Sequence, residues 1–157
     1  MTALIVLLVV TLVARVLGLM LPGLDTWTEA TRLGLAGMFA FTGTSHFSSL
    51  RADFIRMVPP ALPHAGLLVS LTGVLEILGG LALLTPLRPL AGAGLALLLA
   101  LLLPANIHAA RRGVTLGGRP PTALVWRLPL QGLYLGLVLW AALAGEGSLH
   151  DPDIFVR

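Results

Sequence analysis

The sequence predicts an all-α integral membrane protein in which a four-helix transmembrane core carries one N-terminal transmembrane helix and a short interfacial helix. Of the 157 residues, 57% are hydrophobic and only 11% are charged, whereas soluble domains carry roughly a quarter charged residues. Mean hydropathy is +0.95. Apolar stretches approach the length of about 20 residues that an α-helix needs to cross a bilayer. We therefore expect residues 1–157 to form a single transmembrane domain.

The first predicted span covers about residues 3–21 and is interrupted only by Arg15, whose long side chain can reach the membrane surface. A cleaved secretory signal is the alternative interpretation of this segment. However, the segment lacks a basic region before its apolar run and has no clear small-residue cleavage site. We therefore expect it to remain as a helix.

The second predicted span covers about residues 29–46 and is the least apolar, with Arg32 near its start. The third covers about residues 65–85 and carries Glu76 in its interior. Between them, apolar residues in the segment 48–58 repeat at helical spacing against charged residues. This pattern is typical of a short helix that lies in the membrane interface.

The fourth predicted span covers about residues 87–110 and the fifth about residues 123–144. A charged segment with several glycines and two prolines, residues 111–121, indicates an irregular connection between them. Pro104 and Pro129 fall inside these two spans. Each proline lacks an amide hydrogen and frees one backbone carbonyl in its helix.

The distribution of charge predicts the orientation in the cell membrane, because consecutive spans alternate in direction and arginines concentrate in cytoplasmic loops. The face that includes the N-terminus holds five arginines: Arg51, Arg56, Arg111, Arg112 and Arg119. The opposite face holds three arginines and five acidic residues: Arg32, Arg88, Arg157, Asp25, Glu29, Glu146, Asp151 and Asp153. We therefore predict a cytoplasmic N-terminus and a C-terminus outside.

Several kinds of chemistry are excluded or disfavoured by composition. The chain has no cysteine, which excludes disulfides and thiolate chemistry. Its basic residues are all arginine, but a net charge of +3 is too small and scattered for nucleic-acid binding. His46, His64 and His108 are expected near one face, but their spacing matches no metal-binding motif. We expect no metal site.

Glu76 is the most informative polar residue, because an ionisable side chain near the centre of a spanning helix costs a few kcal/mol unless it has a partner or a role. It lies about 16 Å along its predicted helix, near the bilayer midplane. A structural interpretation has a protonated Glu76 bonded to a neighbouring helix. A functional interpretation makes it part of a ligand or proton site.

Other polar residues are predicted at depths between the inner face and Glu76. They form a candidate polar seam for ligand binding, whose members are His46, Thr72, Glu76, Asn106, Arg127 and Gln131. We predict that Glu76 faces the helix interior and contacts at least one of Asn106, Arg127 or Gln131, directly or through water. Alternatively, Asn106 and Gln131 satisfy the carbonyls freed by the two prolines.

Five segments of the chain resemble the DoxX-like family of small integral membrane proteins. They lie in order between Glu29 and Ala144, at residues 41–47, 57–63, 71–80, 104–108 and 127–131. The resemblance implies a four-helix core in the bacterial inner membrane, with the first helix as an addition found in one branch. The motif residues carry over as His46, Glu76, Asn106, Arg127 and Gln131, without an agreed chemical role.

The family resemblance implies no single activity. Its founders are linked to a terminal quinol oxidase and a thiosulfate:quinone oxidoreductase, distant animal relatives act as receptor-assembly chaperones, and most bacterial members have no assigned activity. Branches of the family that work through cysteines are not supported, because this chain has none.

Three functions remain as hypotheses. The favoured one is an accessory, assembly or small-hydrophobic-ligand-binding protein that is not an enzyme, since no nucleophile–base pair is evident and helices rich in small residues can dock other membrane proteins or a second copy. The first alternative is a membrane enzyme or redox component that acts on a quinone or isoprenoid-like lipid, with Glu76 as proton donor or acceptor. The second is a proton-coupled transporter, for which five spans without an inverted repeat offer little support. Apart from a quinone or another lipid-soluble ligand, no cofactor is expected.

Overall fold

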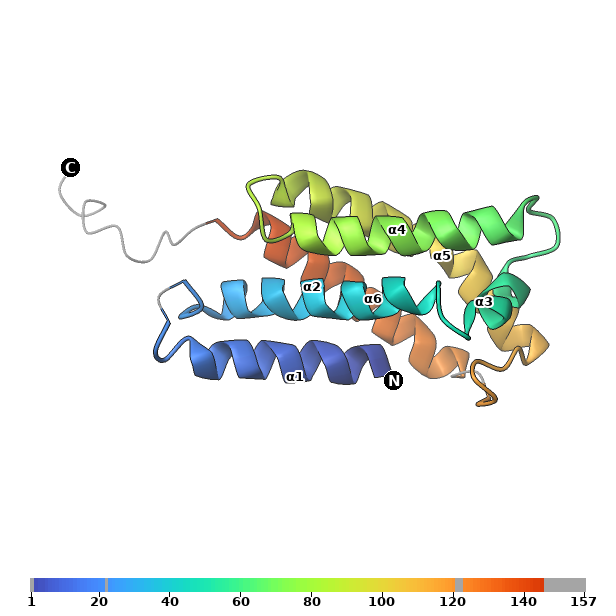
Figure 1. Ribbon diagram of the computed structural model, residues 1–157, viewed down its shortest axis with the longest axis horizontal. Helices are drawn as coiled ribbons and strands as arrows, with labels where there is room; N and C mark the ends of the chain where they lie inside the picture. The colour runs from blue at the N-terminus through green and yellow to red at the C-terminus, as the bar shows by residue number, and fades with distance from the viewer. Residues whose placement is uncertain (1, 22, 121–122, 146–157) are drawn as a thin grey trace.

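The computed structural model describes residues 2–21, 23–120 and 123–145, and these residues form an all-helical bundle without β-strands (Figure 1). Helices α4, α5 and α6 are long and apolar enough to cross a membrane. The chain is therefore a helical membrane protein. The helices of the described residues are α1 (Thr2–Leu17), α2 (Trp27–Ser45), α3 (Arg51–Met57), α4 (Ala65–Ala82), α5 (Arg88–Arg112) and α6 (Leu124–Leu143).

The two N-terminal helices differ from the three long apolar ones. Helix α1 has 16 residues and ends at Leu17, because the chain turns over the following residues rather than continuing to residue 21 as predicted. Helix α2 has 19 residues, but it is too polar to be grouped with α4, α5 and α6 as a span. At a rise of about 1.5 Å per residue, α1 extends over about 24 Å. Length and composition alone therefore support three membrane-spanning helices. The predicted four-helix transmembrane core with one additional N-terminal span stays a prediction.

Helix α2 occupies the centre of the bundle. It lies between α1 and α4 and also contacts α6 (Figure 1). Helix α2 has more buried residues than any other helix, including Thr31 and Arg32. Its polar content is tolerated because neighbouring helices, rather than lipid, surround its side chains.

Small residues allow α2 and α4 to approach closely. A Cβ atom placed on Gly43 would lie 2.7 Å from the carbonyl oxygen of Gly73, and one placed on Gly80 would lie 3.3 Å from the carbonyl oxygen of Ala36. Ala36 and Gly43 are seven residues apart, as are Gly73 and Gly80, so the two antiparallel helices meet at matched positions two turns apart. Any larger side chain there would force the helices apart.

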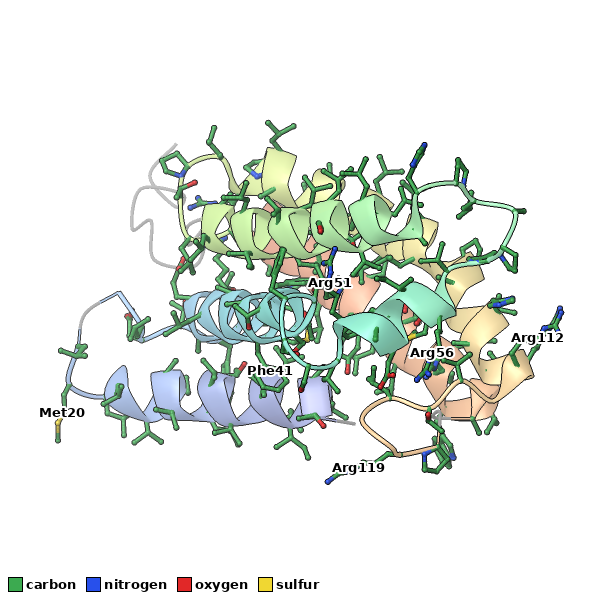
Figure 2. All side chains as sticks on the ribbon, turned by 45° about the vertical axis from the view of Figure 1, so that its right-hand side comes forward. Met20, Phe41, Arg51, Arg56, Arg112 and Arg119 are labelled. Carbon is green, nitrogen blue, oxygen red and sulfur yellow. The ribbon has the colours of Figure 1, made fainter. Side chains whose placement is uncertain are left out.

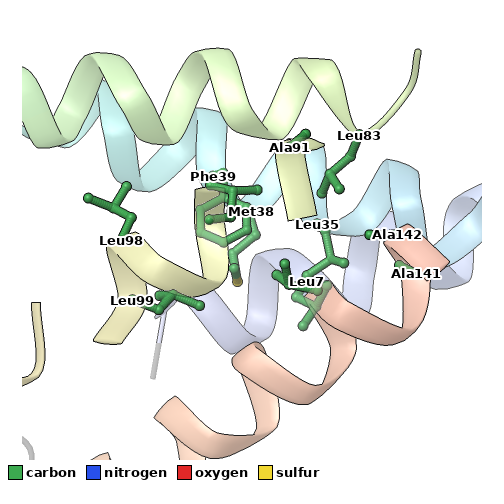
Figure 3. Close-up of a cluster of buried hydrophobic side chains, with 12 residues drawn as sticks. Leu7, Leu35, Met38, Phe39, Leu83, Ala91, Leu98, Leu99, Ala141 and Ala142 are labelled. Atoms are coloured by element: carbon green, nitrogen blue, oxygen red, sulfur yellow. The ribbon is translucent and has the colours of Figure 1, made fainter. Parts of the chain in front are cut away.

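Apolar side chains from α1, α2, α5 and α6 fill the remaining interior, together with Leu83 just after α4 (Figure 3). Phe39 and Met38 of α2 lie at the centre of this cluster. Its buried members are Leu7, Leu35, Met38, Phe39, Leu83, Ala91, Leu95, Leu98, Leu99, Val138, Ala141 and Ala142.

The short helix α3 covers the end of the bundle where α4 begins and α5 ends. It begins at Arg51, three residues later than predicted. Asp53 ties α3 to the loop after α5, because its Oδ2 atom accepts a hydrogen bond of 2.7 Å from the Gly117 amide while its Oδ1 atom pairs with Arg56. Figure 2 shows Arg56 and Arg112 at this end.

The described residues cover only part of the charge pattern used to predict orientation. Glu146, Asp151, Asp153 and Arg157 lie outside them. The side of the membrane that each end faces is therefore not determined by the structure.

Candidate functional site

His46 and Glu76 meet at the interface between α2 and α4. His46 follows the last residue of α2, and its Nε2 atom lies 3.9 Å from the Oε1 atom of Glu76 on α4. Both residues are buried, at 7% and 6% exposure. They can meet because Gly73, one turn before Glu76, leaves room for the backbone of α2 and for the His46 Cβ atom. Glu76 therefore faces the helix interior, as predicted.

The hydrogen bonds of His46 define which nitrogen faces Glu76. Its Nδ1 atom lies 2.9 Å from the Val69 carbonyl oxygen and 3.3 Å from the Thr72 Oγ1 atom. A carbonyl oxygen can only accept, and the Thr72 hydroxyl itself donates to the Val69 carbonyl at 3.0 Å. Nδ1 therefore carries hydrogen, and in the neutral ring Nε2 offers a lone pair toward the carboxyl group.

Two further side chains fix the position of His46. Phe54 of α3 stacks on the imidazole, with ring centroids 4.4 Å apart and ring planes 17° from parallel. Arg51 donates to the His46 carbonyl oxygen at 3.3 Å and to the Gly66 carbonyl oxygen at 2.9 Å. Helix α3 therefore supports the imidazole from outside the α2–α4 pair, an arrangement that sequence spacing did not indicate.

The Glu76 carboxyl group is incompletely bonded. Its Oε2 atom is buried, and no described residue forms a hydrogen bond with it. The Thr42 hydroxyl lies within reach of the Glu76 carboxyl group and also lies 3.1 Å from the Met38 carbonyl oxygen of its own helix. A buried polar atom without a partner is costly. The site can therefore accept a polar group of another molecule, with Nε2 as acceptor and the carboxyl group as donor or acceptor.

A second polar cluster joins α5 to α6. Asn106 donates to Gln131 at 3.3 Å, and Arg127 donates to the Asn106 Oδ1 atom at 3.2 Å. Gln131 donates to the Leu99 carbonyl oxygen at 2.5 Å. This carbonyl adjoins that of Ala100, whose helical hydrogen bond is lost because Pro104 has no amide hydrogen. Among the described residues, neither Asn106 nor Gln131 donates to the carbonyl oxygens of Ala100 and Val125, which the two prolines free, so the predicted satisfaction of these carbonyls is not seen.

The predicted seam is thus divided into two clusters. His46, Thr72 and Glu76 come together in one, and hydrogen bonds join the members of the other, which are Asn106, Arg127 and Gln131. Within the described residues, no hydrogen bond or ion pair links Glu76 to the second cluster. A direct link between the clusters is therefore not seen. A link through water stays a prediction.

Arg32 forms a third polar centre, although its position in the sequence indicates only an outer face. It is 1% exposed and donates to the carbonyl oxygens of Ala141 and Ala144, at 2.8 Å and 2.6 Å. Its third partner is Glu29. The last turn of α6 contains no basic residue, so Arg32 supplies from α2 the positive charge that favours a helix C-terminus.

The candidate metal ligands remain apart. No three His, Cys, Asp or Glu side chains among residues 2–21, 23–120 and 123–145 are grouped so that they could hold a metal ion. His64 lies in the turn before α4, with a positive φ of 54°.

Comparison with curated proteins and with solved structures finds no significant match. A family model described as a domain of unknown function (DUF8561) matches residues 35–144, which is more than two thirds of the chain and includes both the His46–Glu76 site and the second polar cluster. The chain belongs to this DUF8561 family.

Proposed function

We propose that the protein binds a small lipid-soluble molecule with a polar head group, such as a quinone or an isoprenoid-like lipid, at Glu76 and His46. The observation that carries this proposal is the buried Oε2 atom of Glu76, which has no hydrogen-bond partner among the described residues. A carbonyl or hydroxyl group of a ligand would supply that partner. The adjacent Nε2 atom of His46 would accept from a hydroxyl group.

The packing around the pair supports binding over a purely structural role. Helices α2 and α4 are already held together by close contacts at Gly43, Gly73 and Gly80. The Oε2 atom of Glu76 adds no hydrogen bond to that interface within the described chain. The burial of this atom without a partner therefore does not contribute to the stability of the bundle.

Binding is tested on the full chain with a short-chain quinone as the probe. Titration of the detergent-solubilised protein, followed by Trp fluorescence, should show saturable binding that Glu76→Leu and His46→Leu weaken at least about tenfold, a change of about 1.4 kcal/mol. Thr44→Val is the control, because the Thr44 hydroxyl is exposed and bonds only within α2. Equal affinity in all four proteins would refute the site.

Native mass spectrometry of protein extracted from its own membrane identifies the bound species. A retained small hydrophobic molecule that is lost in Glu76→Leu supports the proposal. Retention of another protein subunit with no small molecule contradicts it and favours an assembly role.

An accessory or assembly role is the second candidate, and α6 is the helix that favours it. The glycines Gly73, Gly79, Gly80 and Gly92 pack against this chain's own side chains and are not free to dock a partner. In contrast, Gly132 and Gly136 lie one turn apart on α6, and a Cβ at either position would meet no atom within 4 Å. Such spacing is typical of helix pairs in membranes.

We also propose that α1 and α2 cross the membrane beside α4, α5 and α6, with the N-terminus in the cytoplasm, and that the family is a branch of the DoxX-like proteins. The arginine bias and the five matched segments support these proposals. Because the chain has no cysteine, single cysteines at the exposed positions Ser48 and Thr85 report the topology. An impermeant maleimide should label Thr85→Cys in intact cells and Ser48→Cys only after permeabilisation, and the reverse pattern would contradict the orientation.

A further inference from the structure

A groove runs along one face of α5 near its C-terminal end. It has a volume of about 520 Å³ and is open to the outside of the bundle. Its lining residues form two rows along the helix, each with spacings of three or four residues, so they share one side of the helix. They are Pro104, Ile107, His108, Arg111 and Arg112.

The groove changes from apolar to cationic along the helix axis. Pro104 and Ile107 lie nearer the middle of the span, whereas Arg111 and Arg112 form its last turn. Eight residues of helix separate the two ends by about 12 Å. A phospholipid shows the same order along the membrane normal, with acyl chains in the interior and a phosphate at the surface.

The positive charge at this end of the bundle is not neutralised by the protein. The described residues place six arginines here, and Asp53 is the only acidic residue among them, already bonded to Arg56 and to the Gly117 amide. Arg111 and Arg112 form no hydrogen bond or ion pair with the described part of the chain. The six are Arg51, Arg56, Arg111, Arg112, Arg119 and Arg127.

We propose that this groove binds an anionic phospholipid from the surrounding leaflet, with the phosphate held by Arg111, Arg112 and His108 and an acyl chain lying on Ile107 and Pro104. Guanidinium groups suit phosphate because they present several donors in one plane. The apolar floor favours a lipid over a free anion, since a free anion would gain nothing from Ile107. The groove is separate from the His46–Glu76 site, so the two proposals are independent.

Lipid selectivity tests the proposal. The full chain is purified in mixed micelles of detergent with equal parts of phosphatidylglycerol and phosphatidylcholine, and native mass spectrometry counts the lipids retained. Each arginine near a membrane surface favours anionic lipid by about fivefold, which corresponds to about 1 kcal/mol. The double variant Arg111→Gln/Arg112→Gln should therefore lower the preference for phosphatidylglycerol about 30-fold, which corresponds to about 2 kcal/mol.

A charge-matched control separates the groove from general electrostatic attraction. The double variant Arg56→Gln/Arg119→Gln removes the same charge from the same end but leaves the groove unchanged, and it should keep most of the preference. Equal losses in both double variants, or no preference in the wild-type protein, would overturn the proposal. So would displacement of the retained lipid by inorganic phosphate, which would indicate an anion site without lipid recognition.

Discussion

Replacement of Arg32 by methionine should destabilise the protein strongly. The change keeps an unbranched apolar stem and removes the guanidinium group, whose bonds to the Ala141 and Ala144 carbonyl oxygens measure 2.8 Å and 2.6 Å. A hydrogen bond to a charged group contributes about 1.5–3 kcal/mol, so the loss of these two amounts to about 3–6 kcal/mol. The ion pair with the partly exposed Glu29 adds little to this figure.

Thermal unfolding in detergent measures the effect. For a protein of this size, 1 kcal/mol corresponds to about 2–4 °C in Tm, so Arg32→Met should lower Tm by at least about 6 °C. Arg56→Met is the matched control, because Arg56 also pairs with an acidic residue three positions earlier but is 61% exposed. An exposed pair contributes about 0–1 kcal/mol, so this variant should stay within about 4 °C of the wild-type protein.

Two outcomes would refute the reasoning about Arg32. If Arg32→Met and Arg56→Met lower Tm equally, the two carbonyl bonds contribute nothing measurable. Lysine keeps the positive charge of Arg32 but cannot bond both carbonyl oxygens with one planar group. If Arg32→Lys retains full stability, the charge alone stabilises the end of α6 and the paired hydrogen bonds are not needed.

Two further predictions concern the packing of α2 against α4 and the hydrogen bond from α6 to α5. Gly43→Ala should destabilise the protein by about 1–3 kcal/mol, because the new Cβ would lie 2.7 Å from the Gly73 carbonyl oxygen. Gly132→Ala is the control and should not lower Tm, because nothing lies within 4 Å of its Cβ position. Similar losses of stability in both variants would contradict the close-contact argument. Gln131→Leu should cost between about 0.6 and 1.7 kcal/mol, the average and the maximum for hydrogen bonds between membrane helices, since it removes the bond to the Leu99 carbonyl oxygen. An unchanged Tm in Gln131→Leu would show that water replaces this bond.

The long apolar helices could be predicted from the sequence because their signal is local. Helices α4, α5 and α6 each carry enough consecutive apolar residues to identify them without knowledge of their neighbours. Helix α2 carries a weaker signal, since its composition reflects burial among other helices rather than contact with lipid. The end of α1 was misplaced by about four residues, because apolar residues continue past Leu17 into the turn that leads to α2.

The candidate site was predictable within one helix and unpredictable between helices. Thr72 and Glu76 share a face of α4 by their spacing, and this follows from the sequence. The approach of His46 depends on the close packing at Gly43 and Gly73, and its support by Phe54 depends on the position of α3. The position of a residue along its helix predicts its depth in the membrane but not which neighbouring helix its side chain faces. Depth therefore could not separate the two clusters.

Arg32 was missed as a structural residue for the same reason. Its position near the start of a predicted span is typical of an arginine that reaches the membrane surface, and depth alone supports that interpretation. What decides its role is the end of α6, more than 100 residues later in the chain. One signal was present in the sequence, because the last turn of α6 contains no basic residue to interact with its own free carbonyls.

The polar groups of this bundle differ in what they do for the helices. Arg32 holds the C-terminal end of α6, and Gln131 with Arg127 holds its first half against α5, so α6 depends on polar contacts at both ends. In each case the buried group finds a partner on another helix. The Oε2 atom of Glu76 finds none in the described chain, although α2 and α4 already pack closely without it. Because stability would favour an apolar residue at such a position, this unpartnered atom is the reason for our proposal that Glu76 binds a small molecule.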